Sequence, residues 1–429
     1  MSTNPASEPI GAGRTTAVSD TPTTLQDVFD ARSNSIGFIR FVLAAMVLVG
    51  HSYVLGGFGD EVAWSWTLGQ ENFGGIAVGG FFVLSGFLIT RSYTTTTSVF
   101  RFLWQRFLRI FPAFWVCLLV TAFIIGPLIW RTDHGGFSGY LDISRDSPLD
   151  YVLRNSRLAM RQNNIGDLLA NAPAPRNLNG SLWTLIYELR CYLAVAALGV
   201  FGVFRRARGM VLGLTAMLWV LQLVVIAAPG GGGTLMPADL YLVRLSFLFG
   251  LGACLFLYRE RVPMDDRAGV LATGLLLLSF RYHVYFAIGQ AALAYALLWA
   301  GWRLPFRWFD RYGDFSYGLY LYAFPVQQLL AIYPQAVGHG QLWYVLVTFA
   351  LVVPMSIGSY YLVERPFLRL KNAKVPAPLL TLSGRAAAVT QESFRRPRRA
   401  PVAAEPAATD TDRHSRDLAA EPTQVSGEP

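Results

Sequence analysis

Long runs of apolar residues, separated by short polar segments, dominate the pattern of this chain. A helix of about 20 apolar residues crosses a bilayer, and about ten runs approach or reach this length. They cover residues 36–55, 74–92, 108–130, 182–203, 210–228, 240–258, 268–281, 283–302, 315–334 and 342–363. The seventh run is short, and its boundary with the eighth is the least clearly marked. The pattern predicts an all-α polytopic membrane protein with about ten transmembrane helices.

Composition agrees with this prediction. Charged residues make up only 15% of the chain and hydrophobic residues 53%, whereas a soluble domain has about 25% charged residues. The polar ends of the chain have little to bury, and no cleavable signal peptide is evident. The sequence therefore predicts a disordered N-terminal tail at 1–33, one transmembrane domain at 34–372 and a disordered C-terminal tail at 373–429.

The basic residues indicate how the helices are oriented. Arg and Lys gather in the loops after the second, fourth, sixth, eighth and tenth runs, and none occurs in the short loops 56–73, 229–239 and 335–341. Because short cytoplasmic loops carry an excess of Lys and Arg, both termini are predicted in the cytoplasm, and the protein in the cytoplasmic (inner) membrane. The net charge of +9 then reflects topology and membrane lipids rather than nucleic acid.

The first apolar run contains Arg40 and His51, with ten residues between them. On a helix they lie about 16 Å apart along the axis, with Arg40 near one membrane face and His51 close to the other. Such residues inside a span usually mark a functional site. Arg40 suits binding of an anion, and His51 suits proton transfer. Alternatively, the arginine snorkels to the surface and the histidine bonds to a neighbour.

Other runs also contain polar residues. Ser85 lies near the middle of the second run. Arg106 and Arg109, three residues apart, share a helix face and either clamp a phosphate or set topology. Glu188, in the fourth run, is either functional or one half of a structural ion pair. Glu364, at the inner end of the last run, is expected to pair with the arginine cluster.

Aromatic and basic residues near these positions are candidates for binding a substrate. The candidates are Trp183, Tyr187, Tyr192, Arg244, Tyr317 and Tyr320. For Arg244 a structural pairing is the alternative. Pro325 is expected to kink the ninth helix and free a backbone carbonyl. The three cysteines show no metal-ligand spacing, and no metal site is predicted.

Several of these segments occur together in one known family. Arg40 with His51, FFVLSGFLITR, Arg106-x-x-Arg109-Ile-x-Pro, SLWTLIYE, SYGLYL and VERPF follow one another within residues 36–368. In this order they resemble the acyltransferase-3 family of integral membrane acyltransferases. The resemblance implies about ten spans and transfer of an acyl group, usually acetyl. The donor would be cytoplasmic acyl-CoA, and the acceptor a hydroxyl of a glycan or glycosylated molecule.

The ninth run departs from the family pattern. Many relatives have a histidine before the proline, but here the sequence is Tyr322-Ala323-Phe324-Pro325. Any role of that histidine is therefore absent or taken by another group.

The depths of the polar residues fit such a reaction. In a hydrocarbon core about 30 Å thick, His51 lies about 22 Å from the inner edge and Glu188 about 9 Å from the outer edge. They are therefore predicted at similar depth, while Arg40, Arg106 and Arg109 lie near the inner face. This arrangement suits acetyl-CoA, with its phosphates at the arginines and its thioester arm reaching toward His51.

We therefore expect His51 to act as the general base and Glu188 to orient it. Arg40, Arg106, Arg109 and Ser85 are expected to bind the CoA donor. Direct transfer is preferred, although an acyl-enzyme on Ser85 remains open. The alternative function is a transporter or flippase for a lipid-linked sugar, since buried charges and kinked spans also fit a transport path.

Overall fold

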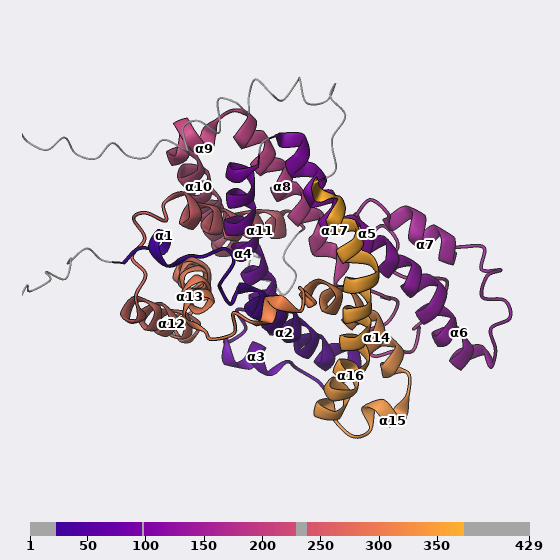
Figure 1. Ribbon diagram of the computed structural model, residues 1–429. Coiled ribbons are helices and arrows are strands. Elements are labelled where there is room, and N and C mark those ends of the chain that lie inside the picture. Colours follow the sequence, from indigo (N-terminus) through magenta and orange to yellow (C-terminus); the bar gives the residue numbers. More distant parts are fainter. Residues whose placement is uncertain (1–22, 97, 229–237, 373–429) are drawn as a thin grey trace, which may run out of the picture.

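The computed structural model describes residues 23–96, 98–228 and 238–372, in which it contains helices and no β-strand (Figure 1). The predicted all-α class is therefore confirmed. The rest of the predicted tails, residues 1–22 and 373–429, lies outside the described residues.

The helices follow one another along the chain in the order that the apolar runs predict. The α-helices are α1 Leu25–Val28, α2 Ile36–Gly56, α3 Val62–Trp66, α4 Phe73–Thr95, α5 Val99–Val120, α6 Gly126–His134, α7 Pro148–Asn155, α8 Leu185–Val200, α9 Val203–Arg206, α10 Arg208–Ala227, α11 Ala238–Leu257, α12 Asp266–Arg281, α13 Gln290–Arg303, α14 Ser316–Ala331, α15 Pro334–Val337, α16 Gln341–Ser359 and α17 Arg365–Arg369. Short π-helices are η1 Thr121–Ile125, η3 Tyr285–Gly289 and η5 Tyr360–Glu364, and short 3₁₀ helices are η2 Leu182–Thr184, η4 Phe309–Arg311 and η6 Leu370–Asn372.

Every predicted span coincides with a helix. In the described ranges, seven helical segments are long and apolar enough to cross a membrane. They are Ile36–Gly56, Phe73–Thr95, Val99–His134, Leu182–Val200, Arg208–Ala227, Leu240–Leu257 and Gln341–Arg369. The other three predicted spans match α12, α13 and α14, with 16, 14 and 16 residues. Between α12 and η3 the chain turns at His283, whose φ is 58°. The protein is therefore an integral, polytopic membrane protein.

Helices α4 and α11 form the most extensive helix pair of the bundle. Glycines on both helices allow their backbones to approach closely. A Cβ at Gly86 would lie 1.9 Å from the Phe249 carbonyl oxygen, and a Cβ at Gly252 would lie 1.9 Å from that of Val83. Any side chain at these two positions would separate the helices, as expected for small residues at a membrane helix interface.

Helix α14 contains the proline that was expected to free a carbonyl. Pro325 has no N–H, so the carbonyl of Leu321, four residues earlier, loses its helical donor. The Asn179 side-chain amide donates to this oxygen at 3.0 Å, and the thiol of Cys117 donates to it at 3.3 Å. The prediction is confirmed, and the long segment between α6 and α8 is thereby attached to the core of the bundle.

Part of the predicted N-terminal tail belongs to the folded body. Leu25 of α1 is only 1% exposed. Its backbone N–H donates to the Val262 carbonyl, and the Met264 N–H donates to the Thr23 carbonyl, each at 2.9 Å. Residues 23–26 are thus hydrogen-bonded to the segment after α11, so this part of the predicted tail is folded. The sequence pattern missed this because the apolar residues of the segment, Leu25, Val28 and Phe29, are too few to form a run.

Candidate active site

Two cavities lie toward opposite ends of α2 and α4. We call the first the arginine cavity; it contains about 870 Å³ of empty space and is lined by Arg40, Val78, Phe81, Phe82, Leu84, Ser85, Leu88, Ile89, Arg106, Arg109, Ile110, Thr184, Leu185, Glu188, Tyr192, Ser316, Tyr317 and Tyr320. We call the second the histidine cavity; it contains about 810 Å³ and is lined by Val47, Gly50, His51, Val54, Glu61, Glu71, Asn72, Gly74, Gly75, Val78, Ser181, Trp183, Tyr241, Arg244, Leu245 and Tyr320.

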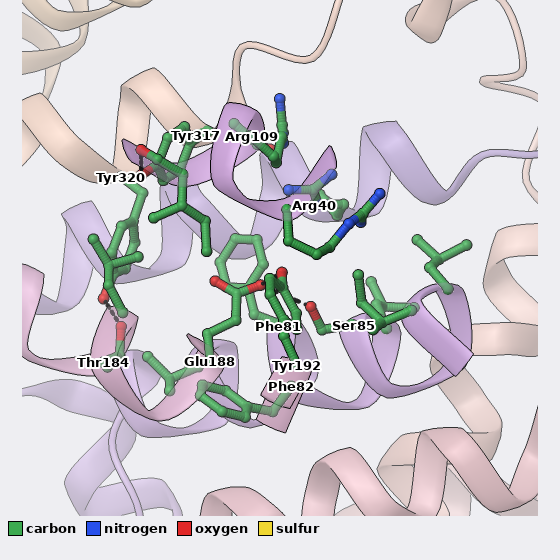
Figure 2. Close-up of a pocket in the computed structure, with 18 residues that line it drawn as sticks. Arg40, Phe81, Phe82, Ser85, Arg109, Thr184, Glu188, Tyr192, Tyr317 and Tyr320 are labelled. Atoms are coloured by element: carbon green, nitrogen blue, oxygen red, sulfur yellow. Dashed lines mark hydrogen bonds between the residues drawn. The ribbon is translucent and has the colours of Figure 1, made fainter. Parts of the chain in front are cut away.

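The arginine cavity brings together the three arginines singled out in the sequence. Arg106 and Arg109 come from one face of α5, as their spacing predicts, and Arg40 comes from the first turns of α2. Figure 2 shows Arg40 and Arg109 on the side of the cavity opposite Glu188. The structure therefore brings these three residues together in one cavity.

Two carboxylates fix two of the arginines. Asp314 accepts hydrogen bonds from Arg40 and Arg109, each at 2.5 Å, and Glu364 accepts one from Arg109 at 3.0 Å. Burial alone would raise the pKa of Asp314, but Arg40 and Arg109 lower it to about 2, so this carboxyl is ionised at neutral pH. The expected pairing of Glu364 with the arginine cluster is confirmed, whereas Asp314 was not anticipated.

Arg106 differs from the other two arginines. In the described part of the chain it has no ion pair, and its Nε is buried without a hydrogen-bond partner. Its guanidinium lies over the rings of Phe102 and Tyr192, at 5.8 and 6.0 Å from their centroids. Aromatic faces stabilise a cation without neutralising it. Arg106 therefore keeps its capacity to bind an anion.

Glu188 belongs to the arginine cavity. Its carboxylate accepts a hydrogen bond from the Ser85 hydroxyl at 2.8 Å and another from the Tyr192 hydroxyl (Figure 2). The expected contact with His51 is absent from the described hydrogen bonds, and the two residues line different cavities. Depth along the membrane normal was predictable, but the direction of each side chain was not. Helix α8 packs on α4 and α5, whereas α2 packs on α14 and on another part of α4.

His51 lies in the histidine cavity with one nitrogen unsatisfied. Its Nδ1 is buried and has no hydrogen-bond partner among the described residues. The Phe324 ring meets the imidazole edge-on, with 5.0 Å between the ring centroids. Phe324 belongs to the Tyr322-Ala323-Phe324-Pro325 stretch, where the sequence departs from the family pattern. Part of this departure is therefore in contact with the candidate base.

The other candidate residues divide between the cavities. Tyr192 and Tyr317 line the arginine cavity, Trp183 and Arg244 line the histidine cavity, and Tyr320 lines both; Tyr187 lines neither. Arg244 forms a buried ion pair with Glu71. The structural pairing that was the alternative for Arg244 is thus present, on the wall of a cavity.

Val78 and Tyr320 line both cavities and form the wall that the cavities share. The Tyr320 hydroxyl is fixed there: it donates to the Ser181 carbonyl at 2.5 Å and lies 2.6 Å from the Thr184 hydroxyl. A group bound on one side of this wall is therefore close to a group bound on the other side.

Three carboxylates that line these cavities or bind their arginines were missed from the sequence. Asp314 lies two residues before the SYG motif, on the side predicted to carry the arginines. Glu61 and Glu71 lie in the loop that was noted only because it has no Lys or Arg. An acidic residue that directly precedes a span, or that recurs in a short loop, was the available signal in both cases.

The described residues contain no group of three or more His, Cys, Asp or Glu side chains placed to hold a metal ion. The fold and the cavities define an integral membrane protein with a cavity lined by three arginines next to a cavity lined by an imidazole. This combination is consistent with transfer of a group from a charged carrier.

Comparison with known proteins gives the family. A family model described as an acyltransferase domain matches residues 33–363, so the chain belongs to the acyltransferase-3 family. The resemblance stated from the motifs is confirmed, as is the prediction that the protein is a membrane acyltransferase. The family membership favours acyl transfer over a transporter or flippase.

Two relatives have similar length. A protein named O-acetyl transferase from Shigella phage Sf6 is 28% identical over 363 residues, which cover 80% of this chain and 98% of the relative. A protein named nodulation protein 10 from Rhizobium leguminosarum bv. viciae is 27% identical over 370 residues, which cover 80% of this chain and 95% of the relative. No solved structure matches the chain.

Proposed function

We propose that this protein is an O-acetyltransferase that moves an acetyl group from cytoplasmic acetyl-CoA to a hydroxyl of a glycan or glycosylated molecule. Similarity to a protein named O-acetyl transferase supports the acetyl group and the hydroxyl acceptor. The positive loops support a location in the cytoplasmic membrane with both termini in the cytoplasm. Residues 34–372 form the catalytic domain in this proposal.

The arginine cavity is proposed to bind the donor. Coenzyme A carries several phosphates, and guanidinium groups bind phosphate oxygens in pairs. Arg106 supplies an unpaired cation, while Asp314 holds Arg40 and Arg109 at the mouth of the cavity. The thioester arm would extend along the apolar part of the cavity toward Tyr320.

The observation that carries the proposal is the shared wall of the two cavities. A thioester at the end of the arginine cavity and an alcohol in the histidine cavity would meet beside Val78 and Tyr320. His51 lies on the alcohol side, and its unsatisfied ring nitrogen supports a role as general base. It would accept the hydroxyl proton as the oxygen attacks the thioester carbonyl, and then return the proton to the departing thiolate.

Glu188 is proposed to act on the donor side. Because it accepts hydrogen bonds from Ser85 and Tyr192, it would fix these two side chains beside the thioester arm. We propose direct transfer, in which Ser85 positions the donor and forms no acyl-enzyme. Incubation with labelled acetyl-CoA alone tests this point, because an acyl-enzyme would retain the label after denaturation.

Purified protein in detergent, given labelled acetyl-CoA and a glycan mixture, tests the function itself. We expect the label to become covalently attached to the glycan, and mass spectrometry to identify the acceptor. The Arg106→Gln protein should need much more acetyl-CoA for the same rate. A wild-type protein that never labels any glycan, but moves a lipid-linked sugar across a vesicle membrane, would contradict the proposal.

A further inference from the structure

We infer that the acceptor group that enters the histidine cavity is an uncharged sugar ring, held by the carboxylate of Glu61. Sugars that carry a carboxylate or phosphate are expected to be poorer acceptors. This inference rests on the proposed function and deepens it, because it names the class of acceptor.

The first step concerns the cations of the cavity. Its lining residues, all in the described part of the chain, include Arg244 and His51 as the basic side chains. Arg244 forms an ion pair with Glu71, and both residues are buried, with exposed fractions of 5% and 6%. A second hydrogen bond from Arg244 goes to the Gly75 carbonyl at 3.4 Å, while its Nε is buried without a partner among the described residues. The arginine is therefore already neutralised, and it offers little to an anionic sugar.

The second step concerns Glu61, which has no basic partner among the described ion pairs. One carboxylate oxygen accepts the Phe73 backbone N–H at 2.5 Å. Both oxygens lie close to α2, because a Cβ at Gly50 would be only 3.2 and 3.3 Å from them. The glycine thus makes room for the carboxylate directly before His51 in the helix. Carboxylate oxygens accept strong hydrogen bonds from hydroxyl groups, and they repel other anions.

The third step concerns the aromatic side chains of the cavity. Trp183 and Tyr241 meet edge-to-face, with 4.7 Å between ring centroids. Both line the histidine cavity. Aromatic faces offer a large apolar surface with a polar edge, which suits the C–H face of a sugar ring. An aromatic wall, a carboxylate and a nearby imidazole together fit a ring with several hydroxyls and no negative charge.

The charge of the cavity lining points to the same class of acceptor. Glu61 and Glu71 oppose one cation, Arg244, so the charged side chains that line the cavity leave an excess of one carboxylate. A like charge placed against another at a binding site costs several kcal/mol. We therefore expect an acidic sugar to be at least about tenfold poorer than its neutral counterpart.

The test compares two acceptors that differ only in charge: a methyl hexopyranoside and the corresponding methyl hexuronoside. Acetyl transfer is measured with the purified full-length protein. Binding is measured separately by saturation-transfer NMR, which needs no turnover. We expect transfer to the neutral glycoside with a kcat/KM at least about tenfold above that of the uronoside, and NMR contacts with the neutral glycoside alone.

Glu61→Gln removes the charge and keeps an oxygen for the Phe73 N–H, so the fold should be retained. We expect a KM for the neutral glycoside about tenfold higher, little change in kcat, and a smaller difference between the two glycosides. The matched control is Asp60→Asn, an exposed neighbour that does not line the cavity. It should leave KM and kcat unchanged for both glycosides.

A kcat/KM of the wild-type protein for the uronoside that equals or exceeds its kcat/KM for the neutral glycoside would overturn the inference. So would a Glu61→Gln protein with unchanged KM for both glycosides, or NMR contacts with neither. If neither glycoside is acetylated but the neutral one alone binds, the proposed function fails while the assigned acceptor class stands.

Discussion

The two cavities hold their charged and titratable groups in opposite ways. In the arginine cavity, Asp314 and Glu364 bind Arg40 and Arg109 in a network, and only Arg106 is left without an ion pair among the described residues. In the histidine cavity the ion pair is complete, and the imidazole of His51 lacks a partner at Nδ1. A cavity that binds a charged carrier benefits from fixed cations, whereas a base must keep a free nitrogen. The difference teaches that one membrane domain can keep binding and proton transfer apart.

The largest expected effect separates chemistry from binding. His51→Ala should lower acetyl transfer by about 10²–10⁴-fold, because a positioned base contributes that much. Affinity for acetyl-CoA, measured by calorimetry, should be unchanged because His51 lies outside the arginine cavity. The control is His339→Ala, an exposed histidine whose loss should leave the rate unchanged. Near-normal transfer by His51→Ala would refute its role as base.

The next effect is on stability. Arg109→Gln leaves the carboxylate of Glu364, only 2% exposed, without its cation. Loss of one partner of a buried ion pair costs about 3–5 kcal/mol, so the apparent melting temperature in detergent should fall clearly.

The double variant Arg109→Gln with Glu364→Gln should recover part of this loss, because no unpaired carboxylate remains. If both variants melt at the wild-type temperature, the network has no structural role.

Arg106→Gln should affect the arginine cavity without this loss of stability. A hydrogen bond to a charged group contributes about 1.5–3 kcal/mol, so the Kd for acetyl-CoA should rise about 10- to 100-fold. The control is Arg369→Gln, an exposed arginine near the same end of the bundle. An unchanged Kd in the Arg106 variant would mean that the donor phosphates bind elsewhere.

The smallest effect concerns the contact between Phe324 and His51. Phe324→His places a second imidazole beside that of His51 with a modest change of volume, so transfer should stay within about tenfold of wild type. The pH–rate profile checks whether a second imidazole shifts the pH dependence of the transfer rate. Recovery of transfer when Phe324→His is added to His51→Ala would show that either position can supply the base.

The sequence predicted well how far along the helices these residues lie, but it predicted poorly where their side chains point. Hydropathy and loop charge gave every span, and helical rise placed Arg40, Arg106 and Arg109 at one level. The rotation of each helix depends on packing such as that of Gly86 against α11, which periodicity does not reveal. For this reason Glu188 was paired with His51 from depth alone.

Loop carboxylates were also beyond the sequence pattern. Asp314 and Glu61 lie outside the apolar runs, where acidic residues are common and ordinarily solvated. Only the tertiary structure shows that one bridges two arginines and the other lies against α2. The family motifs did not help here, because neither Asp314 nor Glu61 belongs to any of them.

The partition formed by Val78 and Tyr320 has a consequence for the cell. An enzyme that reaches both compartments with an open shaft would also let ions and protons leak down their gradients. Because Val78 and Tyr320 lie between the two cavities, with the phenol tied to Ser181 and Thr184, reactants could meet beside these side chains without an open aqueous passage through the protein.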